Sequence, residues 1–122
     1  MLAFYSNIDT LLLFCPALYD KKAYDVQFDS GFTDIIRTPE SWRNTDALAL
    51  LENFSGNLLI VMGEKDEVIP SGVIDLIMQH SKNARKKELY VIPECPHIIN
   101  AWIVDKEKEK IQLQRKIAEY LF

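Results

Sequence analysis

The fold is decided by residues 57–70, which read NLLIVMGEKDEVIP. This stretch begins with a continuous apolar run that shows no polar alternation and that ends at Gly63. Such a run is typical of a strand buried on both faces, as in a parallel sheet. Two more runs of the same kind, TLLLFC at residues 10–15 and ELYVI at residues 88–92, are each followed by a proline. The sequence therefore predicts three buried strands.

The segments between and after these strands have the pattern of helices. Residues 39–54 begin with a proline, carry apolar side chains on one face and are followed by a glycine within two residues. Residues 71–84 place four apolar side chains on one stripe, and residues 105–121 form a charged helix with one apolar face. The order βαβαβα predicts an α/β fold of three layers, with a short parallel sheet and right-handed crossovers.

Length and composition set further bounds. The chain has 122 residues, which fits one domain over residues 1–122, and a formal net charge of -4 without a basic cluster, which argues against nucleic-acid binding. The longest apolar run falls far short of the roughly 20 residues that a membrane span needs. The first residues carry no basic side chain of a signal peptide, and the two cysteines suit free thiols. We therefore expect a cytoplasmic protein that does not associate with membranes.

Residues 20–38 fit neither the strand nor the helix pattern. A connection this long in a compact domain usually has a function or is disordered. Four aromatic side chains favour an ordered cover over disorder: Tyr19, Tyr24, Phe28 and Phe32.

Two side chains with acid–base chemistry follow neighbouring strands. Asp66 follows the strand at residues 57–62, and His97 follows the strand at residues 88–92. In an open parallel sheet, ligands bind outside the carboxyl ends of the strands. An aspartate that accepts the Nδ1 proton of a histidine fixes the tautomer and makes Nε2 a usable general base. Asp66 and His97 are therefore the candidate catalytic pair, and we expect them within or near hydrogen-bond distance.

The two motifs together, GEKDEVIP at residues 63–70 and PECPH at residues 93–97, resemble the C-terminal half of an α/β-hydrolase. Residues 10–19 resemble the sixth strand of that family and its exit, so the resemblance extends from about residue 8 to the end. It implies that Asp66 is the catalytic acid and His97 the base of a Ser-His-Asp triad. It also implies that residues 19–38 are a cap-like segment, whose four aromatic side chains are weaker candidates to contact substrate.

The chain departs from the family at the nucleophile. The family's nucleophile elbow is Gly-x-Ser-x-Gly, which needs two glycines four residues apart. The glycines here are at positions 31, 56, 63 and 72, and no two of them have that spacing. Because the chain order in the family is nucleophile, acid, histidine, the resemblance implies a nucleophile before residue 1.

Simpler interpretations stay open for the same residues. Asp66 could serve only its own turn by bonding nearby backbone amides, and His97 could be a surface residue. Cys95 lies two residues from His97, so a Cys-His pair is conceivable. With two histidines, two cysteines and no usual zinc spacing, the sequence predicts neither a metal site nor a cofactor.

Two functions from different classes follow. The first is the C-terminal portion of an α/β-hydrolase that acts on a small-molecule ester, thioester or similar acyl substrate. The alternative is a truncated, non-catalytic α/β domain that works through self-association or partner binding. In either case, the strand at residues 10–15 lacks its family neighbour and carries no lysine or internal proline to protect its edge. We therefore expect a homodimer or other self-association through residues 8–16.

Overall fold

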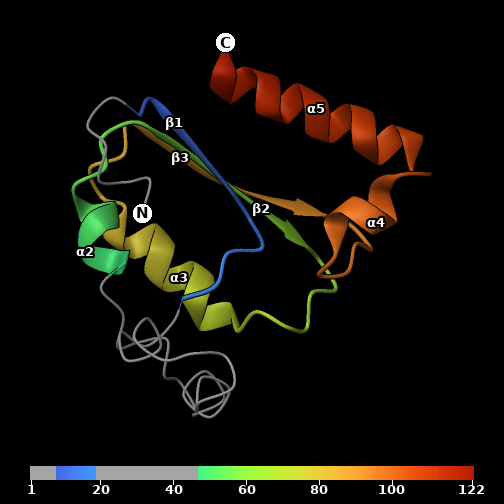
Figure 1. Ribbon diagram of the computed structural model, residues 1–122, viewed down its shortest axis with the longest axis horizontal. Coiled ribbons are helices and arrows are strands. Elements are labelled where there is room, and N and C mark those ends of the chain that lie inside the picture. Colours follow the sequence, from blue (N-terminus) through green and yellow to red (C-terminus); the bar gives the residue numbers. More distant parts are fainter. Residues whose placement is uncertain (1–7, 19–46) are drawn as a thin grey trace, which may run out of the picture.

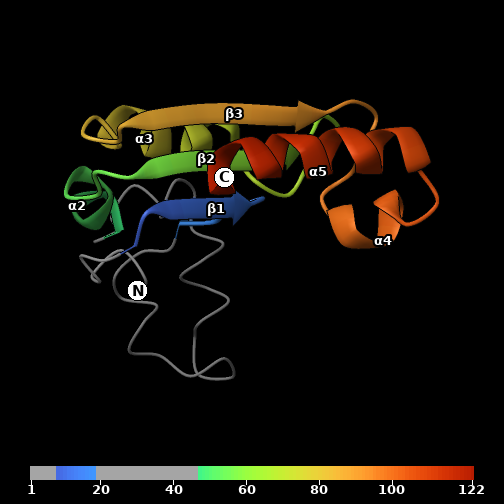
Figure 2. The same ribbon diagram turned by 90° about the horizontal axis from the view of Figure 1, so that it is seen from above.

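A computed structural model of the protein describes residues 8–18 and 47–122. Within these residues, three parallel strands form a sheet in the order β1-β2-β3. The strands are β1 (Thr10–Phe14), β2 (Asn57–Gly63) and β3 (Lys86–Ile92), and the helices are α2 (Ala47–Glu52), α3 (Ser71–His80), α4 (Ile99–Ile103) and α5 (Glu107–Leu121). Helices α2 and α3 lie on one face of the sheet and α5 lies on the other (Figures 1 and 2). The predicted three-layer α/β fold is confirmed.

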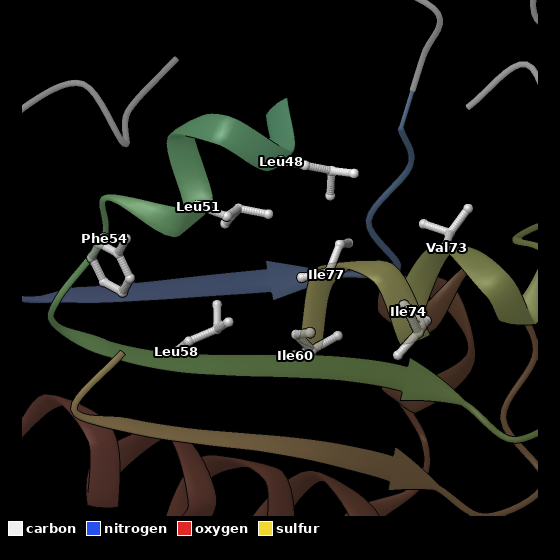
Figure 3. Packing of buried hydrophobic residues seen from close by; sticks show 8 residues of the cluster. All are labelled: Leu48, Leu51, Phe54, Leu58, Ile60, Val73, Ile74 and Ile77. Carbon is white, nitrogen blue, oxygen red and sulfur yellow. The ribbon is translucent and has the colours of Figure 1, made fainter. Parts of the chain in front are cut away.

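The central strand β2 joins two hydrophobic cores because its side chains alternate between the faces of the sheet. Leu58 and Ile60 belong to the cluster on the α3 side, which Figure 3 shows, whereas Leu59 and Val61 belong to the cluster on the α5 side. All four side chains are fully buried. We call these clusters the α3-side cluster (Leu48, Leu51, Phe54, Leu58, Ile60, Val73, Ile74 and Ile77) and the α5-side cluster (Leu59, Val61, Ile92, Cys95, Ile99, Leu113 and Tyr120).

The sequence predicts three strands buried on both faces, and this is right only for β2. In the outer strand β3, Leu89 and Val91 are 39% and 43% exposed, and in β1 Phe14 is 43% exposed. Each outer strand has one described neighbour, so its side chains have less of the sheet and fewer helices around them. In this chain, an apolar run therefore indicates that a segment is a strand of the sheet, but it does not indicate how deeply the side chains of that strand are buried.

Some element boundaries differ from the sequence prediction, and one short helix is additional. Strand β3 starts at Lys86 and not at residue 88, because the backbones of Lys86 and Lys87 also pair with β2. Their charged ends have partners outside the strand: the Lys86 ammonium lies over the Tyr120 ring, and the Lys87 ammonium donates to the Met78 carbonyl. Helix α3 ends at His80, where the Ser81 backbone and hydroxyl both donate to Ile77 O. The five-residue helix α4 was not predicted, because it is too short to show a helical period.

The parallel register sets the position of the site. Phe14 pairs with Val61, and Gly63 pairs with Ile92, so all three strands end at the same edge of the sheet. The loops that leave these carboxyl ends therefore lie next to one another. No helix in the described part of the chain is both long enough and apolar enough to cross a membrane.

Candidate active site

Each of the three strands delivers one reactive side chain to this edge of the sheet. Cys15 directly follows β1, Asp66 lies three residues beyond β2, and His97 lies five residues beyond β3. One potential ligand atom from each of the three lies within 4.8 Å of the other two. The sequence predicted two members of this cluster, Asp66 and His97.

The Asp66 carboxylate is held by its own turn. Its Oδ1 accepts hydrogen bonds from the backbone N–H groups of Val68, at 2.8 Å, and Ile69, at 3.1 Å. Its backbone N–H donates to Gly63 O at 3.1 Å. The simple turn interpretation of Asp66 is thus correct for one carboxylate oxygen, and it leaves the second oxygen free for another partner.

That second oxygen binds His97. Asp66 Oδ2 lies 2.8 Å from His97 Nδ1, so the expected proximity of the two side chains is confirmed. The carboxylate is only 1% exposed, while the imidazole is 33% exposed. Since an ionised carboxylate can only accept, Nδ1 carries the proton in this hydrogen bond, and in the neutral ring Nε2 keeps a free lone pair.

The surroundings keep the Asp66 carboxylate ionised. Burial raises its pKa, but hydrogen bonds from His97 and from the backbone amides of Ile69 and Val68 oppose this, and the net pKa lies below its ordinary value of 3.8. A carboxylate that stays charged beside Nδ1–H favours one tautomer and stabilises an imidazolium when one forms. This arrangement suits a histidine that accepts a proton at Nε2.

Close packing between two loops fixes the distance between Asp66 and His97. The amides of Glu64 and Lys65 donate to Ile92 O and Cys95 O, both at 2.9 Å. A Cβ atom on Gly63 would lie 2.3 Å from both Cys95 O and Pro96 O, so only a glycine fits at the end of β2. Gly63, the first residue of the motif at residues 63–70, must therefore lack a side chain, because the loop that carries His97 packs directly against it.

Cys15 is the member of the cluster that sequence reasoning missed, because its place in an apolar run indicated core packing. Its backbone adopts φ 45, a left-handed conformation that is unusual for a residue with a side chain. Its backbone N–H donates to Val61 O at 2.8 Å, and its thiol donates to His97 O at 3.2 Å. Burial, together with the nearby Asp66 carboxylate, raises the pKa of Cys15 to about 11. The thiol is thus protonated at neutral pH.

A hollow of about 260 Å³ opens beside the imidazole. Its lining includes residues at the ends of β1 and the start of α4: Phe14, Cys15, His97, Ile98, Ile99 and Asn100. Ile98 is 65% exposed and Phe14 is 43% exposed, so the lining of the hollow combines solvent-exposed apolar side chains with the His97 imidazole. Of these six residues, the sequence indicated a functional role only for His97. The others lie at the end of β1 or around α4, which is too short to produce a helical pattern of apolar residues.

Other candidates named from the sequence fall elsewhere. Residues 19–38, with Tyr19, Tyr24, Phe28 and Phe32, lie outside the described residues. Cys95 is fully buried, and its thiol lies 3.4 Å from Pro96 O. Burial also raises the pKa of Cys95, so this thiol is poorly suited to act as a nucleophile with His97.

Comparisons with known proteins give likenesses to solved structures and no match to a family or a curated protein. Among solved structures, the chain is similar to a crystal structure described as a "putative dipeptidyl aminopeptidase IV" from Bacteroides ovatus, with a TM-score of 0.56 and 19% sequence identity. The match covers 93% of this chain and 15% of that chain, so the chain corresponds to a small part of its neighbour. At this identity the likeness concerns the fold alone, and it agrees with the α/β arrangement of a parallel sheet between helices.

Proposed function

We propose that this chain provides the acid–base pair of a serine-type hydrolase that acts on an ester, thioester or similar acyl substrate. The observation that supports the proposal most directly is the 2.8 Å hydrogen bond from His97 Nδ1 to Asp66 Oδ2 at the carboxyl edge of a parallel sheet. The hydrolase-like fold and the hollow beside His97 agree with it.

The proposed chemistry follows from the tautomer. With Nδ1–H bonded to Asp66, His97 Nε2 accepts the proton of an attacking serine hydroxyl while the serine oxygen bonds to the acyl carbon. The imidazolium then gives this proton to the leaving group as the bond to that group breaks. Water hydrolyses the acyl-enzyme by the same route, and the Asp66 carboxylate stabilises the imidazolium in both steps.

The serine and the oxyanion donors of this reaction are proposed to come from a polypeptide segment outside this sequence. The sequence holds no Gly-x-Ser-x-Gly, and Cys15, the described thiol beside the pair, is kept protonated by burial. Since the removal of a triad member leaves only the small rate due to the oxyanion hole and to binding, an Asp-His pair alone has no acyl-enzyme route.

The test uses p-nitrophenyl esters of several acyl lengths with this chain and with a form extended upstream through a nucleophile elbow. We expect no turnover from the chain alone and turnover from the extended form. In the extended form, His97→Ala is expected to reduce turnover by at least about 10³-fold. The matched control is His80→Ala, which removes the other histidine, paired with Glu52 away from the site, and should leave turnover unchanged. Turnover from the chain alone that His97→Ala abolishes would contradict the proposal of an external nucleophile.

One observation favours the alternative of a domain that acts through self-association. Strand β1 pairs only with β2 within the described residues, and its last residue, Phe14, is 43% exposed. Unpaired backbone groups beside apolar side chains form a surface on which another strand can add. This alternative predicts association without any role for His97, so His97→Ala should leave it unchanged.

A further inference from the structure

We propose that Cys15, Asp66 and His97 form a binding site for Zn²⁺ at the carboxyl edge of the sheet. This inference goes beyond the hydrolase proposal and does not depend on it. Sequence spacing gave no indication of such a site, because the three residues are 51 and 31 positions apart (66 − 15 and 97 − 66). The parallel sheet brings them together by placing each one just beyond a different strand.

The donor atoms are of the types that zinc prefers. A thiolate sulfur, a carboxylate oxygen and an imidazole nitrogen are all common zinc ligands, with bonds of about 2.3, 2.1 and 2.0 Å. In a tetrahedral site these bonds imply donor separations of about 3.3–3.6 Å. The donors here all lie within 4.8 Å of one another, and the Asp66–His97 separation is 2.8 Å. Small side-chain rotations therefore suffice to enclose an ion.

Two of the ligands already have supporting contacts. The Asp66 carboxylate is fixed through Oδ1 by the amides of Val68 and Ile69, which leaves Oδ2 as the ligand atom. Outer hydrogen bonds of this kind orient the ligands of protein metal sites. The Cys15 backbone adopts φ 45 directly after β1, and its N–H donates to Val61 O. Residues in such rare backbone conformations cluster at functional sites.

The site also has a position open to solvent. Cys15 and His97 line the hollow of about 260 Å³, so a water molecule or a small ligand can complete a four-coordinate zinc ion. Coordination through Nδ1 moves the proton of the neutral imidazole to Nε2, and the Cys15 thiol gives up its proton to solvent. Zinc and the Asp66–His97 hydrogen bond are therefore mutually exclusive states of the same side chains.

Co²⁺ and Zn²⁺ titrations of the full chain test the inference. The wild type is expected to bind one Co²⁺ with the near-ultraviolet charge-transfer band of a thiolate ligand, and Zn²⁺ should displace the Co²⁺. Cys15→Ser should abolish this band and weaken Zn²⁺ binding at least about tenfold, and His97→Ala should weaken it similarly. Circular dichroism of each variant checks that the fold is retained.

Two matched variants separate this site from general metal binding by thiols and imidazoles. Cys95→Ala removes the other cysteine, which is buried, and His80→Gln removes the other histidine, which is bonded to Glu52. Both should bind Co²⁺ and Zn²⁺ as the wild type does. A wild type without the thiolate band, or an affinity that Cys15→Ser leaves unchanged in a folded protein, would overturn the proposal.

Discussion

Replacement of Gly63 by alanine tests the link between the packing of the strand ends and the geometry of the site. The new methyl group would lie 2.3 Å from the carbonyl oxygens of both Cys95 and Pro96. An ordinary carbon–oxygen contact is near the sum of the van der Waals radii, roughly 1 Å longer than this, so the methyl overlaps two backbone atoms. Backbone atoms cannot rotate away as the end of a side chain can, and the loop that leads to His97 must move.

The expected cost has two sources. Overpacking at a filled site typically costs about 1–3 kcal/mol. Movement of the loop also breaks the hydrogen bond from Lys65 N–H to Cys95 O, which adds about 1 kcal/mol. Gly63→Ala should therefore lower the free energy of unfolding by about 2–4 kcal/mol. Because Asp66 lies on one side of the contact and His97 on the other, it should also lengthen their hydrogen bond.

Urea unfolding measures the first effect, and NMR of the His97 ring nitrogens measures the second. The matched control is Gly72→Ala, which adds the same methyl group in the first turn of α3, where alanine favours the helix. This control should leave stability unchanged or raise it by a few tenths of a kcal/mol. A loss below about 0.5 kcal/mol for Gly63→Ala, with unaltered His97 nitrogen signals, would refute the argument that this contact sets the site.

Three further predictions concern the site, the sheet edge and the α5 contact. Asp66→Asn should lower the free energy of unfolding at pH 7 by about 1.5–3 kcal/mol, since it weakens a charged hydrogen bond to His97. The stabilisation from a lowered carboxyl pKa is lost on acidification, so urea unfolding should show this difference disappear as the pH falls below the ordinary carboxyl pKa of 3.8. If the wild type self-associates through β1, light scattering at micromolar concentration should show a dimer that Phe14→Lys reduces to a monomer. Leu12 is a poorer position for this substitution, because its side chain packs against the α5-side cluster. A dimer that Phe14→Lys leaves unchanged would place the contact elsewhere. Tyr120→Phe should lower the free energy of unfolding by about 0.5–1.5 kcal/mol at pH 7, because it removes the 3.0 Å hydrogen bond to Glu88. Burial and this contact raise the pKa of Tyr120 to about 12, so the difference from the wild type should shrink as the pH rises above 10. An unchanged difference at pH 11 would contradict this reasoning.

The sequence predicted the sheet well because its strands form continuous apolar runs that end at glycine or proline. β2 follows this pattern most closely, and it is the strand whose central residues are fully buried. The edge strand β3 was harder to delimit, since Lys86 and Lys87 pair with β2 while their charged ends reach the Tyr120 ring and Met78 O. Such boundaries depend on contacts with distant segments, and no local pattern of polar and apolar residues records them.

The candidate site shows the same division. Asp66 and His97 could be predicted because residues just beyond adjacent parallel strands meet at one edge, whatever the details of the loops. Cys15 could not be predicted as a neighbour of this pair, since its apolar flanks suggest packing. Its thiol reaches the His97 carbonyl through the registers of β1 on β2 and of β2 on β3, which the sequence does not display. Its presence gives the pair a third partner that can donate a hydrogen bond as a thiol or bind a metal as a thiolate. In the proposed zinc site, an ion would displace both the Cys15 proton and the hydrogen bond between Asp66 and His97, so His97 Nδ1 would face either the carboxylate or the ion.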